Sequence, residues 1–302
     1  AANTRKWTIV YFHHPPYTMG SHNSDTESEL VLLRQNLAPI LEQYDVDLVL
    51  NGHSHSYERS KLQKDHFGLE ATFDRAIHQV SQSSGRYDGT VNSCTYLKDS
   101  PATLGGTVYA VVGSSGKLEP GAVTFPHAAM YYGNDDIGGS MVIEIEDNRL
   151  DGKWLSADGV IRDNFTIMKE VNKVNNINVV AGESVTMTAS WVGQYSWSSG
   201  QTTRSLTVTP ASSTTYTVTD SYSCITDTYN LNVISASLAI DIPSVGFSQI
   251  CAGSNVSIAY TISGSFNPGN VFTLQMSNSS GSFTSPVTIG TLSSTSAGTI
   301  NG

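Results

Sequence analysis

The apolar and polar positions of the first fifty residues predict a β-α-β unit. Residues 7–12 form a nearly continuous run of β-branched and aromatic side chains, which is typical of a strand covered on both faces. Across residues 30–44 the apolar side chains recur at helical spacing, and Pro39 interrupts them, so we expect the helix to kink or split there. Residues 47–50 predict a second short strand, which leads directly into the polar segment 51–55.

Beyond this unit the pattern becomes mainly β. Residues 106–113, 141–145 and 164–168 carry further strand patterns, whereas residues 60–103 are polar, rich in serine and glycine, and predict a long loop. From about residue 175, short alternating strands between Gly, Ser and Pro turns fit a small β-sandwich of about seventy residues. The low charge of this half also fits disorder, but its β-branched and aromatic strand residues favour the folded alternative.

An internal repeat indicates that the β-rich half holds two modules. The segment VAGESV at 180–185 reappears as CAGSNV at 251–256. We therefore predict three domains, at residues 1–172, 173–235 and 236–302. The second copy of the repeat stops in mid-pattern at the end of the chain, so we expect the third domain to be truncated.

Composition narrows the classes of function and location. The 302-residue chain has a formal net charge of −10, which would repel a phosphate backbone and argues against nucleic acid as a partner. It has no run of 18 apolar residues, so we expect no membrane span. The charge-poor, Ser/Thr-rich second half is typical of extracellular modules and predicts a secreted or cell-surface protein. The chain opens on Ala1 without a signal region, so we expect a processed start or a piece of a longer protein.

Three histidines follow the two strands of the β-α-β unit. His13 comes directly after the first strand, and His53 and His55 follow the second. Because ligand sites of open α/β sheets form outside the carboxyl ends of the strands, we expect these imidazoles to converge there. Gly52 lets the backbone turn without a Cβ clash, and imidazole nitrogens bind borderline divalent metals. The alternative is a polar turn that binds no metal.

The residues around these histidines resemble a known family. The sequences VYFHHPPY at 10–17 and DLVLNGHSHSYERS at 47–60 resemble the H-x-P-x-Y and G-H-x-H-x-Y-E-R-S motifs of the calcineurin-like metallophosphoesterases, and of the purple acid phosphatases in particular. Residues 150–169 are similar to the end of the same domain, so the resemblance covers residues 1–169. It implies an α/β fold, a partial metallophosphoesterase β-sandwich flanked by helices. The repeats that follow resemble all-β immunoglobulin-like modules.

The resemblance implies metal-dependent hydrolysis of phosphate monoesters at a two-metal site. One metal would be bound by His13 and His53 and the other by His55, and the two ions would be iron, zinc or manganese. Two such cations polarise phosphoryl oxygens and lower the pKa of a bound water, which supplies a hydroxide nucleophile. His22 lies where the family carries a catalytic histidine that binds the phosphate or protonates the leaving group. The alternative for His22 is a solvated loop histidine.

The chain departs from the family in the metal ligands that precede the H-x-P strand. The bridging aspartate, the aspartate and tyrosine of the first metal and the asparagine of the G-N-H motif have no counterparts here. Three imidazoles carry no negative charge to hold two dications together. We therefore expect this chain to be the C-terminal half of a catalytic domain followed by accessory modules, and to be inactive alone.

Several other side chains receive structural assignments. His14 is expected to point away from His13 if strand alternation continues, and Glu58 and Arg59 are expected to pair locally below the site. Three further histidines in loop-like sequence are expected at the surface: His66, His78 and His127. Three aromatic residues of the first β-module resemble immunoglobulin-like core residues, with a carbohydrate-stacking platform as the alternative: Tyr195, Trp197 and Tyr216.

The three cysteines are too few for a disulfide scaffold or a thiolate metal site. Alignment of the repeats places Val180 opposite Cys251, so the first module has only the late cysteine of an immunoglobulin-like pair, Cys224, and the second only the early one. Neither module can close its own bridge, and the ends of a module hold Cys224 and Cys251 apart. We therefore predict three free thiols, with Cys94 unpaired in its loop.

Three functions compete on this evidence. The first is a secreted phosphomonoesterase of the purple acid phosphatase type, acting on a phosphate ester. The second is a phosphodiesterase or nucleotidase on the same scaffold, because substrate choice depends on loops. The third is a surface adhesion protein with an inactive phosphoesterase part, in which the β-modules contact glycans or other cell-surface partners.

Overall fold

The computed structural model describes residues 5–98, 105–234, 238–246, 251 and 253–302. Its contacts divide the chain into two compact units. One unit comprises residues 1–177 with 186–208 and 215–230, and the other comprises 178–185, 209–214 and 231–302. The division passes through the first β-module, so the domain boundaries expected at 172 and 235 stay predictions.

A five-stranded mixed sheet organises the first part of the chain. Its order is β1 (Ile9–Tyr11), β2 (Leu48–Asn51), β5 (Val108–Val112), β3 (Tyr57–Ser60) and β6 (Met130–Asn134). Strands β1, β2 and β5 are parallel, and β3 and β6 run antiparallel to their neighbours. The expected β-α-β unit is therefore confirmed. The expectation that both faces of the first strand are covered holds for Val10 and Ile9, which pack against different apolar cores, but not for Tyr11, which is 82% exposed.

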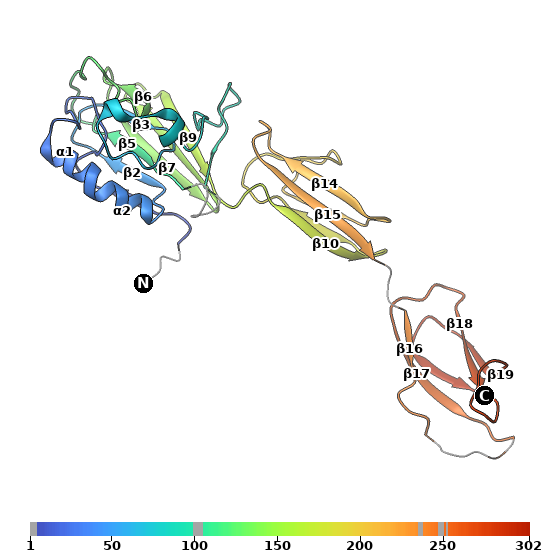
Figure 1. Ribbon diagram of the computed structural model, residues 1–302. Coiled ribbons are helices and arrows are strands. Elements are labelled where there is room, and N and C mark those ends of the chain that lie inside the picture. Colours follow the sequence, from blue (N-terminus) through green and yellow to red (C-terminus); the bar gives the residue numbers. More distant parts are fainter. Residues whose placement is uncertain (1–4, 99–104, 235–237, 247–250, 252) are drawn as a thin grey trace. The chain divides into compact units, whose positions relative to one another are not determined.

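Helices cover one face of this sheet (Figure 1). The predicted helix is split into α1 (Ser28–Leu32), a π-helical turn η1 (Leu33–Leu37) and α2 (Ala38–Gln43), with Pro39 in the first turn of α2. This confirms the break expected at the proline, where a backbone N–H is missing. Side chains of the helices, the sheet and the following loops form one apolar core: Tyr17, Leu41, Val46, Val49, Tyr109, Val111, Ala129 and Met130.

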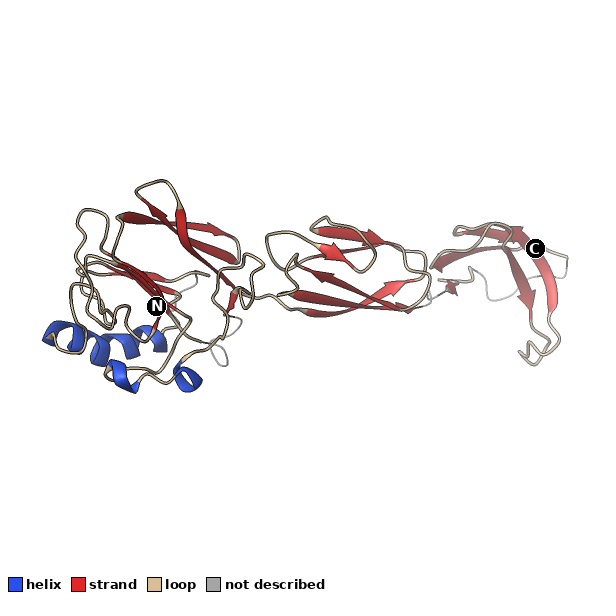
Figure 2. Ribbon diagram, turned by 90° about the horizontal axis from the view of Figure 1, so that it is seen from above, coloured by secondary structure: helices blue, strands red, loops and turns tan. Residues whose placement is uncertain are grey.

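A second sheet packs on the opposite face of the first, as Figure 2 shows. Its order is β4 (Tyr96–Leu97), β9 (Ile161–Met168), β8 (Arg149–Ser156) and β7 (Gly139–Glu146). The apolar core between the sheets contains Leu48, Leu62, Tyr96, Val108, Ala110, Leu150, Phe165 and Ile167. The structure therefore has the helix-flanked β-sandwich expected for this part. The long loop predicted over residues 60–103 is wrong in part, because it contains β4, a 3-10 turn η2 (Glu70–Thr72) and α3 (Arg75–His78).

Two groups of β-strands follow. The first consists of the sheet β10 (Val174–Val180), β15 (Thr226–Ile234), β14 (Thr214–Thr219) and β12 (Ser196–Trp197), with the pair β11 (Val185–Thr188) and β13 (Ser205–Val208). The second consists of β16 (Ala239–Asp241), β17 (Ser257–Ser263) and β20 (Gly298–Asn301), with the pair β18 (Val271–Met276) and β19 (Val287–Ser293). Trp197 is buried, whereas Tyr195 and Tyr216 are half-buried. The immunoglobulin-like identity of these groups stays a prediction.

Strand β3 carries its charged residues on opposite faces. Arg59 points between the sheets, where its Nε and Nη2 atoms lie 2.6 and 2.9 Å from the carboxylate of Asp163. Glu58 points the other way and accepts hydrogen bonds from the hydroxyl of Thr18 and from the backbone N–H of His127. The expected Glu58–Arg59 pair is therefore wrong, because successive side chains of a strand point to opposite faces.

Two histidines expected at the surface are buried. His66 and His127 are 2% and 0% exposed, and both pack against Tyr17. Burial, with further contributions from neighbouring charges, lowers the pKa of His66 to about 4 and that of His127 to about 3. Both imidazoles are therefore neutral in the folded state near pH 7. Only His78 is half-buried, so the surface assignment is wrong for the other two.

We predict that acid destabilises this core through His66 and His127. The unfolded chain binds protons on both imidazoles below about pH 6.5, whereas the folded chain does so only near the lowered pKa values. The free energy of unfolding should therefore fall with decreasing pH by up to about 1.4 kcal/mol per pH unit for each histidine. Urea denaturation from pH 7 to 4.5 measures the slope, and His127→Asn, which keeps an acceptor for the Ala129 N–H, should reduce it. An unchanged slope in this variant would contradict the argument.

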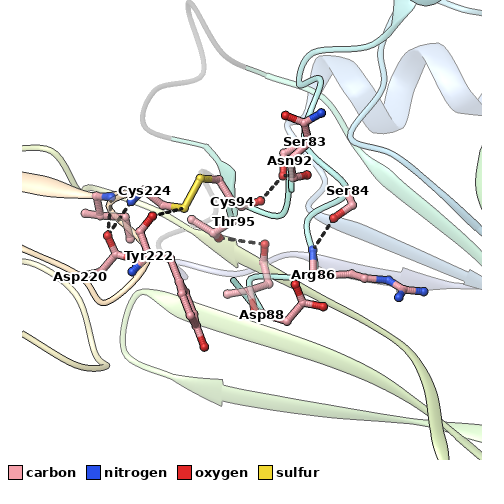
Figure 3. The surroundings of a disulfide bond; sticks show 12 residues. Ser83, Ser84, Arg86, Asp88, Asn92, Cys94, Thr95, Asp220, Tyr222 and Cys224 are labelled. Atoms are coloured by element: carbon pink, nitrogen blue, oxygen red, sulfur yellow. Dashed lines mark hydrogen bonds between the residues drawn. A yellow bond between two sulfur atoms is a disulfide. The ribbon is translucent and has the colours of Figure 1, made fainter. Parts of the chain in front are cut away.

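A disulfide joins Cys94 to Cys224, and Figure 3 shows its surroundings. The prediction of three free thiols is therefore wrong, and of the described cysteines only Cys251 is free. The prediction considered pairing only within and between the β-modules, whereas this bond links the segment before β4 to the turn after β14, across a separation of 130 residues. The ring of Tyr87 also meets that of Tyr222 edge-on, with centroids 5.1 Å apart. Side-chain packing thus accompanies the covalent bond.

We predict one reactive thiol per chain when the unreduced protein is denatured, and three after reduction. Because the bond closes a loop of 130 residues, the double variant Cys94→Ser/Cys224→Ser should lower the free energy of unfolding by about 2–4 kcal/mol. Thiol titration and urea denaturation measure the two effects. Cys251→Ser is the matched control, since this cysteine is exposed and unbonded. Three reactive thiols in the unreduced chain would contradict the structure.

Candidate metal centre

Hydrogen bonds from the Asn51 side chain and the Gly52 backbone fix the ends of β1 and β2 side by side. The amide of Asn51 donates from Nδ2 to the carbonyl of Phe12 at 2.9 Å and to that of His14 at 3.4 Å. The N–H of Gly52 donates to the carbonyl of His13 at 3.0 Å. The histidine segments that follow the two strands are thus joined directly at the carboxyl edge of the sheet.

His13 and His53 converge as expected. Nε2 of His13 lies 3.1 Å from Nδ1 of His53. Two nitrogens bound at about 2.0–2.1 Å to one metal ion lie about 2.9–3.4 Å apart, so this spacing suits shared coordination. His53 reaches the position through a left-handed backbone conformation with φ 63°, supported by a tight turn from Ser54 N–H to the Gly52 carbonyl. Metal binding by the pair stays a prediction.

His14 also faces this site, against expectation. One ligand atom from each of His13, His14 and His53 lies within 4.8 Å of the others. The rings of His14 and His53 have centroids 4.4 Å apart. Strand alternation does not apply here, because β1 ends at Tyr11 and the following residues turn. The two adjacent histidines in the sequence were the signal for this contact.

His22 and Glu27 form a second group with His53. Nδ1 of His22 lies 2.8 Å from Oε2 of Glu27, and its ring stacks on that of His53 with centroids 3.7 Å apart. Nε2 of His53 lies 3.5 Å from the same carboxylate oxygen. No motif of the sequence marks Glu27, which precedes the helical pattern of residues 30–44. The backbone N–H of Asn23 donates to Oε1 of Glu27 and holds the carboxylate beside the histidines.

The residues of this group shift the pKa values of one another. Partial burial raises the pKa of Glu27, but hydrogen bonds from the N–H of Asn23 and from His22 outweigh it, so the pKa is lowered. Burial and the nearby imidazoles of His22 and His14 lower the pKa of His53. The carboxylate is thus ionised and the central imidazole neutral near pH 7, which are the forms that bind a metal cation.

His55 lies beside the other histidines and is not part of either three-residue group found among the described residues. Its ring centroid is 6.5 Å from that of His22. Its Nδ1 is 2.5 Å from Oε2 of Glu119, and its backbone N–H donates to the hydroxyl of Ser21 at 2.9 Å. No motif of the sequence marks Glu119 on the segment after β5. Of the three imidazoles expected to converge, only those of His13 and His53 are therefore in direct contact.

The described residues offer two possible groups of metal ligands, which share His53. One group is His13, His14 and His53, and the other is His22, Glu27 and His53. Imidazole nitrogens, alone or with a carboxylate, suit zinc, iron or manganese. For a second ion the described residues offer His55 with Glu119 nearby. Bound metal ions would place positive charge at the carboxyl edge of the sheet, where an anionic ligand would be attracted.

Comparison with known proteins agrees with the motifs. Residues 1–57 match the family model described as calcineurin-like phosphoesterase, and they include all four candidate histidines. Two uncharacterized proteins from strains of Mycobacterium tuberculosis are each 30% identical over 131 residues, which cover 41% of this chain and 21% of each relative. The chain thus spans about a fifth of the length of these curated relatives.

Two solved structures are similar to this chain. Purple acid phosphatase PPD1 from seeds of yellow lupin (Lupinus luteus) has a TM-score of 0.41 and 20% identity, covering 54% of this chain and 25% of that chain. GAP50, the anchor in the inner membrane complex of Plasmodium, has a TM-score of 0.35 and 19% identity, covering 56% of this chain and 39% of that chain. At these scores neither structure assigns a role to a residue here. As for the membrane, none of the helices in the described ranges is long and apolar enough to cross it.

We predict that the histidine turn depends on the missing side chain of Gly113, at the end of β5. A Cβ atom there would lie 1.9 Å from the carbonyl oxygen of Ser54. Gly113→Ala should therefore displace the turn that carries His53 and His55 and cost about 1–3 kcal/mol of stability. Gly116→Ala in the same loop meets nothing within 4 Å and is the matched control. Thermal unfolding of both variants tests this, and equal melting temperatures would contradict it.

Proposed function

We propose that this chain is part of a metal-dependent phosphoesterase. In this proposal His13 and His53 hold one metal ion, and His55 belongs to the second. The observation that supports it most is the 3.1 Å approach of the two imidazole nitrogens at the carboxyl edge of parallel strands. The family-model match over residues 1–57 supports phosphate-ester hydrolysis in general.

The side chains divide the proposed chemistry among them. Bound metal ions would polarise the phosphoryl oxygens and activate a water molecule. His22 is held at Nδ1 by Glu27, which leaves Nε2 to bind the phosphate or to donate a proton to the leaving group. The carboxylate of Glu27 orients the ring of His22.

Iron, zinc and manganese are the metals that this donor set would take, and a phosphate monoester is the proposed substrate. A phosphodiester or nucleotide remains the alternative on the same scaffold. Because the chain spans about a fifth of its curated relatives, the activity belongs to the whole protein in this proposal. The chain alone is proposed to be inactive, since Glu27 is the one carboxylate in the histidine groups of the described residues.

The disulfide supports a location outside the cytosol. Bonds such as Cys94–Cys224 persist in oxidising compartments and are rare where glutathione keeps thiols reduced. We therefore propose a secreted or cell-surface enzyme that meets phosphate esters outside the cell. Contact of the β-modules with glycans or the cell surface is a further proposal, and a net charge of −10 disfavours nucleic acid as a partner.

We predict that His13→Ala and His53→Ala each lower phosphatase activity of the whole protein by at least about 100-fold, because each removes a ligand of one metal. Hydrolysis of p-nitrophenyl phosphate, compared with its bis-ester, measures activity and separates a monoesterase from a diesterase. His78→Ala is the control, because the ring of His78 packs against His66 and Phe73, which are not part of the candidate metal site. Full activity in either ligand variant, or strong turnover by the 302-residue chain alone, would contradict the proposal.

A further inference from the structure

The segment after β5 is tied to the histidine turn by its backbone. The N–H of Gly113 donates to the carbonyl of Ser56 at 3.1 Å, and the N–H of Glu119 donates to the carbonyl of His55 at 3.3 Å. Further along, the N–H of Gly121 donates to Asp135 at 2.7 Å. Glu119 is therefore placed beside His55 by its own backbone and by anchors on both sides, so its position does not depend on the side-chain contact alone.

The two carboxylate oxygens of Glu119 have different partners. Oε2 lies 2.5 Å from Nδ1 of His55, and Oε1 lies 2.6 Å from Nζ of Lys117. The lysine charge keeps the carboxylate ionised, and an ionised carboxylate only accepts hydrogen bonds. Nδ1 of His55 must then be the donor.

This contact selects one tautomer of His55. A neutral imidazole carries a single proton, so a proton on Nδ1 leaves Nε2 with a free lone pair. Metal-binding histidines commonly donate their second ring N–H to a carboxylate, which fixes the ring and increases its basicity. His13 and His53 differ, because their facing nitrogens contact each other.

We propose that Glu119 is a positioning residue for His55: it holds the imidazole by Nδ1 and presents the lone pair of Nε2 to a divalent metal ion. The proposal rests on the proposed function and deepens it. It assigns a role in the metal site to a residue 64 positions away from His55, on a segment outside the histidine motifs.

The tautomer of His55 can be read directly from its ring-nitrogen signals by NMR. The 302-residue chain is labelled with ¹⁵N-histidine and studied without metal at about pH 8, above the ordinary imidazole pKa of about 6.5. His55→Gln identifies the signals of His55. In the unsubstituted chain we expect protonated Nδ1 and bare Nε2. In Glu119→Ala we expect the Nε2–H form to predominate.

Two variants separate positioning from a general effect on folding. Glu119→Gln keeps an acceptor oxygen and should retain most of the Nδ1–H form, whereas Lys117→Ala keeps the carboxylate and should retain it fully. The signals of His13 should not change in any of the three variants. An Nε2–H form in the unsubstituted chain, or an unchanged tautomer in Glu119→Ala, would overturn the proposal.

Titration with Zn²⁺ alone distinguishes this proposal from the proposed function. Zn²⁺ should shift Nε2 of His55 at a lower concentration in the unsubstituted chain than in Glu119→Ala, by about 10–100-fold. If the His55 signal shifts at the same Zn²⁺ concentration in the unsubstituted chain and in Glu119→Ala, the proposed role of Glu119 would also be overturned. If the tautomer behaves as expected but Zn²⁺ shifts neither His13 nor His53, the proposed binding of one metal ion by His13 and His53 fails and the hydrogen bond to Glu119 stands.

Discussion

The parallel pairing of β1 with β2 is the constraint on which the candidate site depends. It is fixed by polar contacts at both ends. At the start, buried Asp47 accepts the N–H of Thr8 at 2.8 Å and pairs with the ammonium groups of Lys98 and Lys169 at 2.9 and 2.7 Å. At the other end, Asn51 and Gly52 bind the carbonyls of residues 12–14. Between these ends each strand has only three or four residues, so a shift of one position would separate the imidazoles of His13 and His53.

The local parts of this arrangement could be predicted from the sequence. Strand periodicity and the carboxyl-edge rule were sufficient to bring His13 and His53 together, and Pro39 marked the break in the helix. The parts that failed depend on tertiary packing or on pairs distant in the sequence. His127 lies in loop-like sequence but packs beneath Tyr17, and Cys94 pairs with a residue 130 positions away. Periodicity reports on near neighbours only, so it carries no information on either contact.

Glu27 and Glu119 illustrate a second limit of sequence reasoning. Both carboxylates lie within hydrogen-bond distance of a candidate histidine, but neither belongs to a motif. Glu27 is brought in by a turn five residues after His22, which a helical pattern conceals. Glu119 lies on the segment after β5, and the path of this segment is set at Gly113, which approaches the carbonyl of Ser54 closely. Charge balance around imidazoles is therefore a property of the folded loops, and the lack of the bridging carboxylate in the sequence did not exclude other carboxylates from the neighbourhood of the histidines.

The segment Tyr57-Glu58-Arg59-Ser60 shows why a motif can be specific without touching the site. On one face of β3, Tyr57 stacks on Trp154 and donates to Asp163, which also holds Arg59 between the two sheets. On the other face, Glu58 accepts hydrogen bonds from Thr18 and Met19, just before His22, and Ser60 accepts the N–H of Tyr109. One face of β3 therefore packs against the second sheet, and the other face binds the loop that carries His22. Because a charge buried without its partner is costly, each of these residues constrains the others, and the four residues support the candidate site from below rather than provide its histidines.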